Sequence, residues 1–213
     1  MPDLAFTMLG VEAERYAVQP MLRFRLEVAA SAPVENISLQ CQFRIEPMRR
    51  GYGPFEHDTL SDLFGEAARW GETLKSFLWA LVPATVPALG ARTAFDVLVP
   101  CSFDFNLAAT KYLHGIESGD VPLSILFSGS TFYRDAEDRL QIEQVSWSHA
   151  VSYRLPAAVW QAMMDRYYPN SAWLRLDRAV FDKLYRAKRR FGVPTFEQTL
   201  ERLLAGEPAE TLQ

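Results

Sequence analysis

The chain has 213 residues, of which 49% are hydrophobic, and its 22 Lys and Arg against 26 Asp and Glu give a net charge of −4 at pH 7. A chain of this length can bury a large core, and we expect one compact unit. The negative charge gives the molecule no electrostatic reason to bind nucleic acid or an anionic membrane, so we expect no nucleic-acid partner.

The sequence indicates a cytoplasmic protein. Its first residues enter a strand-like run directly, without a basic segment, a long apolar stretch or a small-residue cleavage site. No apolar run approaches the roughly 20 residues of a membrane-spanning helix, so we expect no membrane insertion. Two cysteines in a chain of this size form no disulfide framework.

The first 46 residues predict three strands, at 4–11, 21–28 and 36–46. Apolar and polar residues alternate without interruption from Ile37 to Glu46, which places the apolar side chains on one face of an extended strand. Phe43 lies on this apolar face, and we expect it to be buried.

A loop and a helical segment follow. Residues 47–54 hold two glycines and two prolines, which favour a loop. From Asp58 the apolar spacing becomes helical, first with Leu60, Leu63 and Phe64 and then, after Gly71, with a second stripe from Leu74 to Leu81 that Pro83 ends. We therefore expect a helical insertion at about 58–82.

Strand patterns return at 93–105, 121–127, 132–133, 140–145 and 151–155, with a short helix or turn at 107–116. Residues 128–130 suggest a bulge or a close backbone approach, and residues 135–138 a charged hairpin tip. The fold predicted is mainly β with α (α+β), an antiparallel β-sandwich-like core with a helical insertion and a C-terminal helical tail.

The C-terminal segment predicts three helices. The first, after Pro156, carries an apolar stripe that includes Trp160 and Met164. The second is capped by Asp177 and buries Val180, Phe181 and Leu184, and the third begins at Thr195 with a capping-box spacing. We expect a sandwich-like domain at 1–155 and a helical tail at 156–213 packed on the same domain.

No residue pattern identifies a catalytic, metal or cofactor site. Cys41 and Cys101 lie on apolar strand faces, and neither they nor His57, His114 and His149 show a chelating spacing. Ser128, His149 and Asp104 can be combined into a triad on paper, but no nucleophile elbow accompanies them, and the carboxylates at 135–138 suit an exposed turn. We expect no cofactor.

Two surfaces are candidates for binding a protein partner. Between residues 171 and 190 seven Lys and Arg face two Asp, and Arg186, Lys188, Arg189 and Arg190 are expected in the last turn of a helix. This cluster either complements the helix dipole or docks on an acidic partner surface. The loop with Arg49, Arg50, Tyr52 and Phe55 either anchors an interface or folds back onto the sheet.

Several short motifs spread over nearly the whole chain carry a family resemblance: 42–47 with Arg49 and Arg50, 63–65 with Trp70, 77–79, 99–101, 103–105, 111–113, 119–129, 152–156, 159–160, 164–165, and 168–171 with 173–175. With these motifs the chain resembles a family of uncharacterised bacterial proteins classed as a domain of unknown function. Some members are encoded beside genes for uptake nickel–iron hydrogenases. The resemblance implies an accessory role near hydrogenase assembly and supplies no activity.

The sequence thus favours a non-enzymatic cytoplasmic accessory or adaptor protein that binds another protein. Two alternatives stay open. One is a hydrolase or small-molecule-binding protein with a pocket between sheet and helices, and the other is a chaperone-like binder of unfolded segments. The sequence does not determine the oligomeric state.

The metal content of the purified protein tests whether it binds a metal ion. We expect the purified protein to contain zinc, nickel and iron at well below one equivalent, because its Cys and His residues lack chelating spacing. Elemental analysis by mass spectrometry measures this, and one tightly held equivalent of any of these metals contradicts the prediction.

Overall fold

The computed structural model describes residues 2–146 and 148–206, and the chain divides into two compact units, Met1–Ser171 and Ala172–Gln213. The first unit holds β1 (Leu4–Ala13), β2 (Met21–Ala30), β3 (Asn36–Ile45), β4 (Phe77–Val86), β5 (Arg92–Pro100), β6 (Asp120–Arg134), β7 (Leu140–Gln144) and β8 (Ala150–Pro156). Its helices are α1 (Pro54–Phe64), α2 (Trp70–Thr73), α3 (Leu107–His114) and α4 (Ala157–Tyr167), with short 3-10 turns at Pro47–Arg49 and Ala67–Arg69. The second unit holds α5 (Arg178–Phe191) and α6 (Phe196–Leu204).

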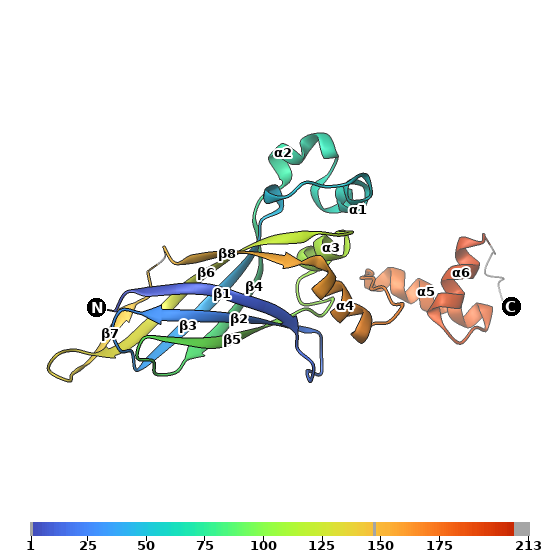
Figure 1. Ribbon diagram of the computed structural model, residues 1–213. Coiled ribbons are helices and arrows are strands. Elements are labelled where there is room, and N and C mark those ends of the chain that lie inside the picture. Colours follow the sequence, from blue (N-terminus) through green and yellow to red (C-terminus); the bar gives the residue numbers. More distant parts are fainter. Residues whose placement is uncertain (1, 147, 207–213) are drawn as a thin grey trace. The chain divides into compact units, whose positions relative to one another are not determined.

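The strands form two antiparallel sheets, which confirms the predicted fold class. One sheet has the order β1-β2-β5, and the other has the order β4-β3-β6-β7, with β8 also paired to β6. The sheets lie face to face (Figure 1), and α3 and α4 cover the end of the sandwich opposite the β6–β7 hairpin. The predicted antiparallel sandwich with helical additions is therefore present.

Aromatic rings join the two sheets at the centre of the sandwich. Phe24 on β2 packs against Phe43 on β3 with ring centroids 4.7 Å apart, and Trp79 on β4 meets both rings edge-on. A second contact joins the sheets: the ring of Phe6 on β1 stacks on the ring of Phe127 on β6, with centroids 4.1 Å apart. Phe43 is fully buried, as its strand phase predicts.

The second half of the predicted helical insertion is wrong. Helix α1 begins at Pro54 and α2 ends at Thr73, and residues 77–82 belong to β4, which pairs with β3. A register shift in this ladder leaves the adjacent Trp79 and Ala80 both buried, so the apolar residues lose the two-residue period of a strand. Pro83 is accommodated because β4 hydrogen-bonds to a strand on one side only.

Gly129 is the close backbone approach that the sequence suggested at 128–130. It has a φ of 141°, and a Cβ atom there would lie 2.0 Å from the carbonyl oxygen of Ser38 on β3. It lies between the part of β6 that pairs with β8 and the part that pairs with β7. Glycine thus lets one long strand change partners.

The described C-terminal helices agree with the predicted ones in position. Helix α4 buries Trp160, Met163 and Met164 and belongs to the first unit, while α5 and α6 make up the second. The predicted tail reaches residue 213, and its last seven residues lie outside the described part of the chain. No helix among residues 2–146 and 148–206 is long and apolar enough to cross a membrane.

Replacement of Phe43 tests the importance of the contact between the sheets. We expect Phe43→Ala to lower the free energy of unfolding by about 3–5 kcal/mol, because it removes a fully buried ring from a close-packed core. Chemical denaturation measures the change. Gln40→Ala, on the exposed face of the same strand, is the control and should change stability by less than about 0.5 kcal/mol. Equal effects of the two substitutions would contradict the assignment of the faces.

Candidate functional site

The second unit is a pair of helices with well-defined ends. The Asp177 carboxylate accepts a hydrogen bond from the backbone N–H of Ala179 at 2.8 Å, which caps α5 at the predicted residue. Gly192 ends α5 with a φ of 61°, and the Thr195 hydroxyl accepts from Gln198 N–H at 3.3 Å to open α6. Local sequence therefore determines where both helices begin and where α5 ends.

Aromatic rings connect α5 to α6. Phe196 of α6 lies 5.5 Å from Phe181 and 6.2 Å from Tyr185, measured between ring centroids. The ammonium of Lys188 lies 5.0 Å from the centre of the Phe196 ring, in a cation–π contact. These contacts hold the two helices together as a hairpin, which we call the α5–α6 hairpin (residues 178–204).

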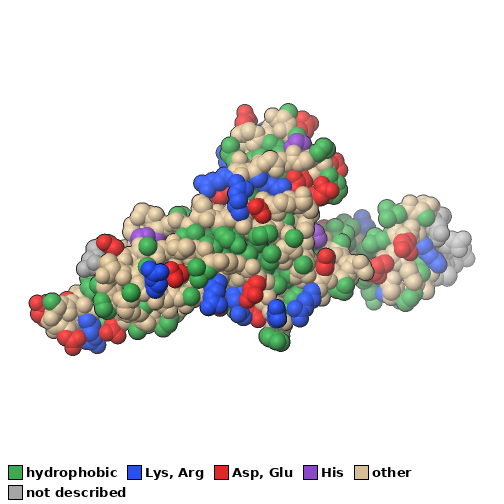
Figure 2. Space-filling model, in the orientation of Figure 1, with side chains coloured by type: hydrophobic (Ala, Val, Ile, Leu, Met, Phe, Trp, Pro, Cys, Tyr) green, Lys and Arg blue, Asp and Glu red, His purple; other side chains and the backbone are tan. Residues whose placement is uncertain are grey.

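The α5–α6 hairpin has almost no buried core. Thr199 is its one buried residue, and the predicted burial of Val180 and Phe181 is wrong, because their exposed fractions are 49% and 44%. Green hydrophobic side chains are visible on the surface of this unit in Figure 2. The exposed apolar side chains of the hairpin are Val180, Phe181, Tyr185, Leu200, Leu203 and Leu204. Two helices offer each other only one side, so their wide apolar stripes stay partly uncovered.

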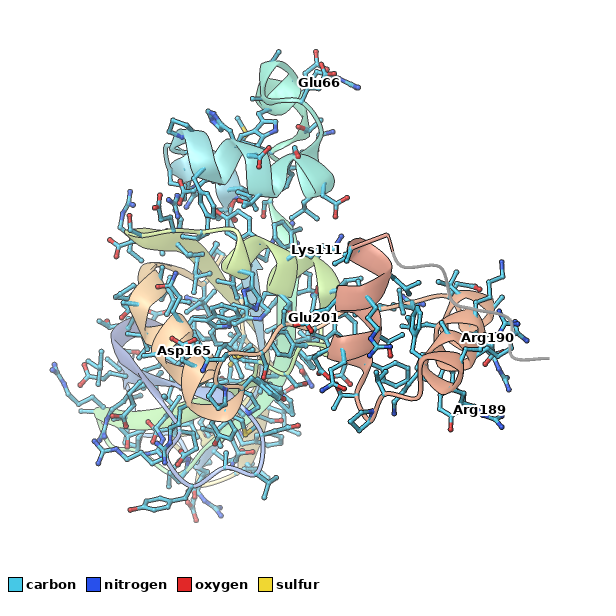
Figure 3. The ribbon with its side chains drawn as sticks, turned by 90° about the vertical axis from the view of Figure 1, so that its right-hand side faces the viewer. Glu66, Lys111, Asp165, Arg189, Arg190 and Glu201 are labelled. Carbon is cyan, nitrogen blue, oxygen red and sulfur yellow. The ribbon has the colours of Figure 1, made fainter. Side chains whose placement is uncertain are left out.

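The polar side of the hairpin is strongly basic. Helix α5 contains six Lys and Arg and a single acidic residue, Asp182. Lys188, Arg189 and Arg190 lie in its last turn as predicted, and Arg186 lies one turn earlier. Figure 3 shows Arg189 and Arg190 projecting from α5 on the side away from α6. Basic and apolar groups thus share one small unit.

One cation of the loop at 49–55, Arg50, is enclosed by the first unit. The side chain of Arg50 is 10% exposed and pairs with Glu56, which is 5% exposed, at 2.7 Å. Glu56 also accepts hydrogen bonds from the backbone N–H groups of Gly53 and Glu117. Arg50 therefore serves to hold the start of α1.

The other residues of this loop differ in exposure. Tyr52 donates to the carbonyl of Pro47 at 2.8 Å or shares a hydrogen bond with the Tyr112 hydroxyl at 2.9 Å, and burial raises its pKa. Phe55 is 55% exposed, and Arg49 is exposed and hydrogen-bonds to the Ser152 hydroxyl at 3.4 Å. Arg49 and Phe55 thus stay accessible to a partner, whereas Tyr52 is partly enclosed.

The surroundings of Cys41, Cys101 and His114 suit a structural role. Burial raises the pKa of Cys41 and of Cys101 to about 12, so both are protonated, buried thiols, and they lie on different sheets. His114 stacks on Phe103 and meets Trp160 edge-on, and partial burial lowers its pKa while Asp165 opposes the shift. Within the described residues, no three His, Cys, Asp or Glu side chains are placed to hold a metal ion.

No observed contact joins Ser128, His149 and Asp104, the three residues that the sequence allows to be combined into a catalytic triad. Ser128 lies on β6, while Asp104 follows β5 near the end that carries α3. The ring of His149 packs edge-on against Phe6, 5.6 Å between centroids, and no hydrogen bond joins it to Ser128 or Asp104.

The sequence matches a family of unknown function, DUF6084, over residues 1–212. The chain belongs to this family. The match covers both units, so the α5–α6 hairpin is part of what the family shares with this chain. No curated protein matches the chain.

Similar solved structures share little sequence with this family member. The solution structure of a putative late embryogenesis abundant protein is 10% identical, with a TM-score of 0.31 over 73% of this chain and 72% of that one. A β-glucosidase from Kluyveromyces marxianus is 6% identical, with a TM-score of 0.24 over 72% of this chain and 15% of that one. A β-glucosidase from Paenibacillus barengoltzii is 13% identical, with a TM-score of 0.28 over 83% of this chain and 21% of that one. TM-scores this low carry no argument about function.

The buried ion pair yields a stability prediction. Arg50→Met should lower the free energy of unfolding by about 3 kcal/mol, because the Glu56 carboxylate then stays buried without its cation. The double variant Arg50→Met, Glu56→Gln should recover part of this loss, since it also removes the buried charge. Urea denaturation measures both. A double variant no more stable than Arg50→Met alone would show that the charge of Glu56 is not the cause.

Proposed function

We propose that this protein is a non-enzymatic adaptor whose α5–α6 hairpin docks on an acidic surface of another protein. The observation that carries the proposal is the combination, in one small unit, of exposed aromatic and leucine side chains with an excess of five positive charges on α5. Aromatic residues and arginine are the types that most often anchor protein interfaces.

The energetics of the hairpin support a docking role. Helices of 14 and 9 residues are marginal on their own in water, and their stability ordinarily comes from burying an apolar face. The hairpin buries little of its own face. A partner that covers Phe181, Tyr185 and Leu204 would supply the missing burial, so binding and stabilisation of the hairpin would be coupled.

The distribution of charge favours an acidic partner. Helix α5 carries +5, which leaves −9 on the rest of a chain whose net charge is −4. An acidic surface is attracted by the hairpin and repelled by the remainder of the chain. Encounters would therefore be steered so that the hairpin meets the partner first.

The partner we infer takes part in hydrogenase-related assembly in the cytoplasm. This narrower part of the proposal rests on the family resemblance, in which some bacterial members are encoded beside uptake nickel–iron hydrogenase genes. Two free, buried cysteines suit a reducing compartment. Affinity capture with chemical cross-linking from the native cell identifies the partner.

Charge reversal tests the docking surface once the partner is purified. The variant with Arg186, Lys188, Arg189 and Arg190 changed to Glu should associate at least about tenfold more slowly, and its association rate should lose its salt dependence. Stopped-flow or surface plasmon resonance measures the rate at several salt concentrations. Circular dichroism establishes that the variant is folded before its binding is compared.

A matched variant controls for net charge. Arg25, Arg69, Lys75 and Arg154 are exposed cations of the first unit, and changing them to Glu alters the net charge by the same amount. This control should slow association far less. If both variants slow it equally, or if neither does, the hairpin is not the docking surface.

A further inference from the structure

A cavity of about 280 Å³ opens at the end of the sandwich away from α3 and α4. It is lined by residues 2–4 at the start of β1, by Thr131 of β6, and by residues 143–146, 148 and 149. Figure 1 shows the start of β1 and β7 at this same end of the sandwich. We call this cavity the mouth. Its volume is about nine times that of a water molecule in the liquid, which suits a small organic ligand.

The interior of the sandwich becomes polar at the mouth. On β3 and β6 the inward-facing residues pair in register, and Thr131 lies opposite the fully buried Ile37. On the other side, Thr131 lies opposite Glu143 of β7. Neighbours directly opposite one another in a sheet point to the same face, so Glu143 lies on the inner face of the sheet.

Polar side chains of the mouth have unused hydrogen-bonding capacity. Thr131 is 3% exposed and lines the cavity, yet its hydroxyl forms no hydrogen bond with any described residue. The side chains of Asp3, Glu143 and His149 line the same cavity, and they too form no hydrogen bond within the described part of the chain. Asp3 is exposed and Glu143 and His149 are half-buried, so solvent reaches these three side chains. Buried polar groups are ordinarily satisfied, so the enclosed hydroxyl of Thr131 is the group that points to a ligand in the cavity.

Apolar groups form the remainder of the lining. Leu4 and Val145 are 8% and 4% exposed, and both line the cavity. The ring of His149 is held edge-on against Phe6, which itself stacks on Phe127. A ligand in the mouth would therefore meet apolar carbon as well as polar groups.

The charge of the lining favours a cation. Asp3 and Glu143 contribute two carboxylates, and no Lys or Arg is among the lining residues. These acidic groups and His149 are not placed as a metal-binding set within the described residues. The N–H groups of an ammonium ion can donate to a hydroxyl oxygen as well as to carboxylates, so such an ion suits this lining better than a bare metal ion.

We propose that the mouth binds a small organic ammonium ion, a primary amine with a short apolar tail. Its N–H groups donate to the carboxylates of Asp3 and Glu143 and to the hydroxyl of Thr131. Its tail lies against Leu4 and Val145. All of its lining residues belong to the first unit, and the proposal does not depend on the adaptor function of the α5–α6 hairpin.

Binding of a matched pair of probes tests the site in the full-length protein. Pentylammonium and 1-pentanol have the same shape, and only the first carries the charge. We expect pentylammonium to bind with millimolar or better affinity by calorimetry and to shift the NMR signals of His149 and Thr131. Pentanol should bind at least about tenfold more weakly, because a hydrogen bond to a charged group is stronger than one between neutral groups.

Two substitutions locate the interaction. Glu143→Gln should weaken pentylammonium binding at least about tenfold, and Asp3→Asn provides an independent second variant if the first does not fold. Glu137→Gln, on the exposed hairpin tip, is the matched control and should bind like the unchanged protein. Circular dichroism and the melting temperature establish that each variant is folded.

The same measurements can overturn the proposal. No binding of pentylammonium at millimolar concentration, equal binding of pentanol, or unchanged affinity in both Glu143→Gln and Asp3→Asn would each exclude an ammonium site. Tight binding of zinc or magnesium that displaces pentylammonium would assign the mouth to a metal ion instead. Loss of partner binding in the charge-reversed hairpin would leave these outcomes unaffected.

Discussion

The packing of Phe24 against Phe43 and Trp79 is the contact on which the first unit depends. It joins β2 to β3 and β4, and these strands belong to different sheets. With the sheets held face to face, the two ends of the sandwich take different roles. Helices α3 and α4 cover one end, whereas the other end opens into the mouth. The close-packed aromatic rings at the centre therefore fix the strands that carry the polar side chains of the mouth.

The two units of the chain differ in how much of their apolar surface they bury. The sandwich buries a continuous apolar core, and even the charged Arg50 and Glu56 near α1 are enclosed as a pair. The α5–α6 hairpin exposes most of its apolar stripe and relies on ring contacts of Phe196 with α5. A unit that lacks a core gains stability from whatever covers it, which is the thermodynamic basis for a docking function.

The mouth and the hairpin also differ in how their charges act. In the mouth, the half-buried Glu143 shares the cavity with the buried Leu4 and Val145, so solvent screens its interaction with a cation less than at an open surface. On the hairpin, Arg189 and Arg190 are exposed, and salt screens them. Ligand binding in the mouth should thus depend on direct hydrogen bonds, whereas docking by the hairpin should depend on long-range attraction and ionic strength.

The sequence by itself determined the strands with a regular period and the capped helix ends, because alternation and capping are local properties. Phe43 and Asp177 were placed correctly for this reason. Strand β4 escaped detection because a bulge beside Trp79 disrupts the period, and such a bulge exists only in the pairing with β3. Tertiary structure alone decided that Arg50 is enclosed and that residues 3, 143 and 149 line one cavity, since these depend on which distant segments meet.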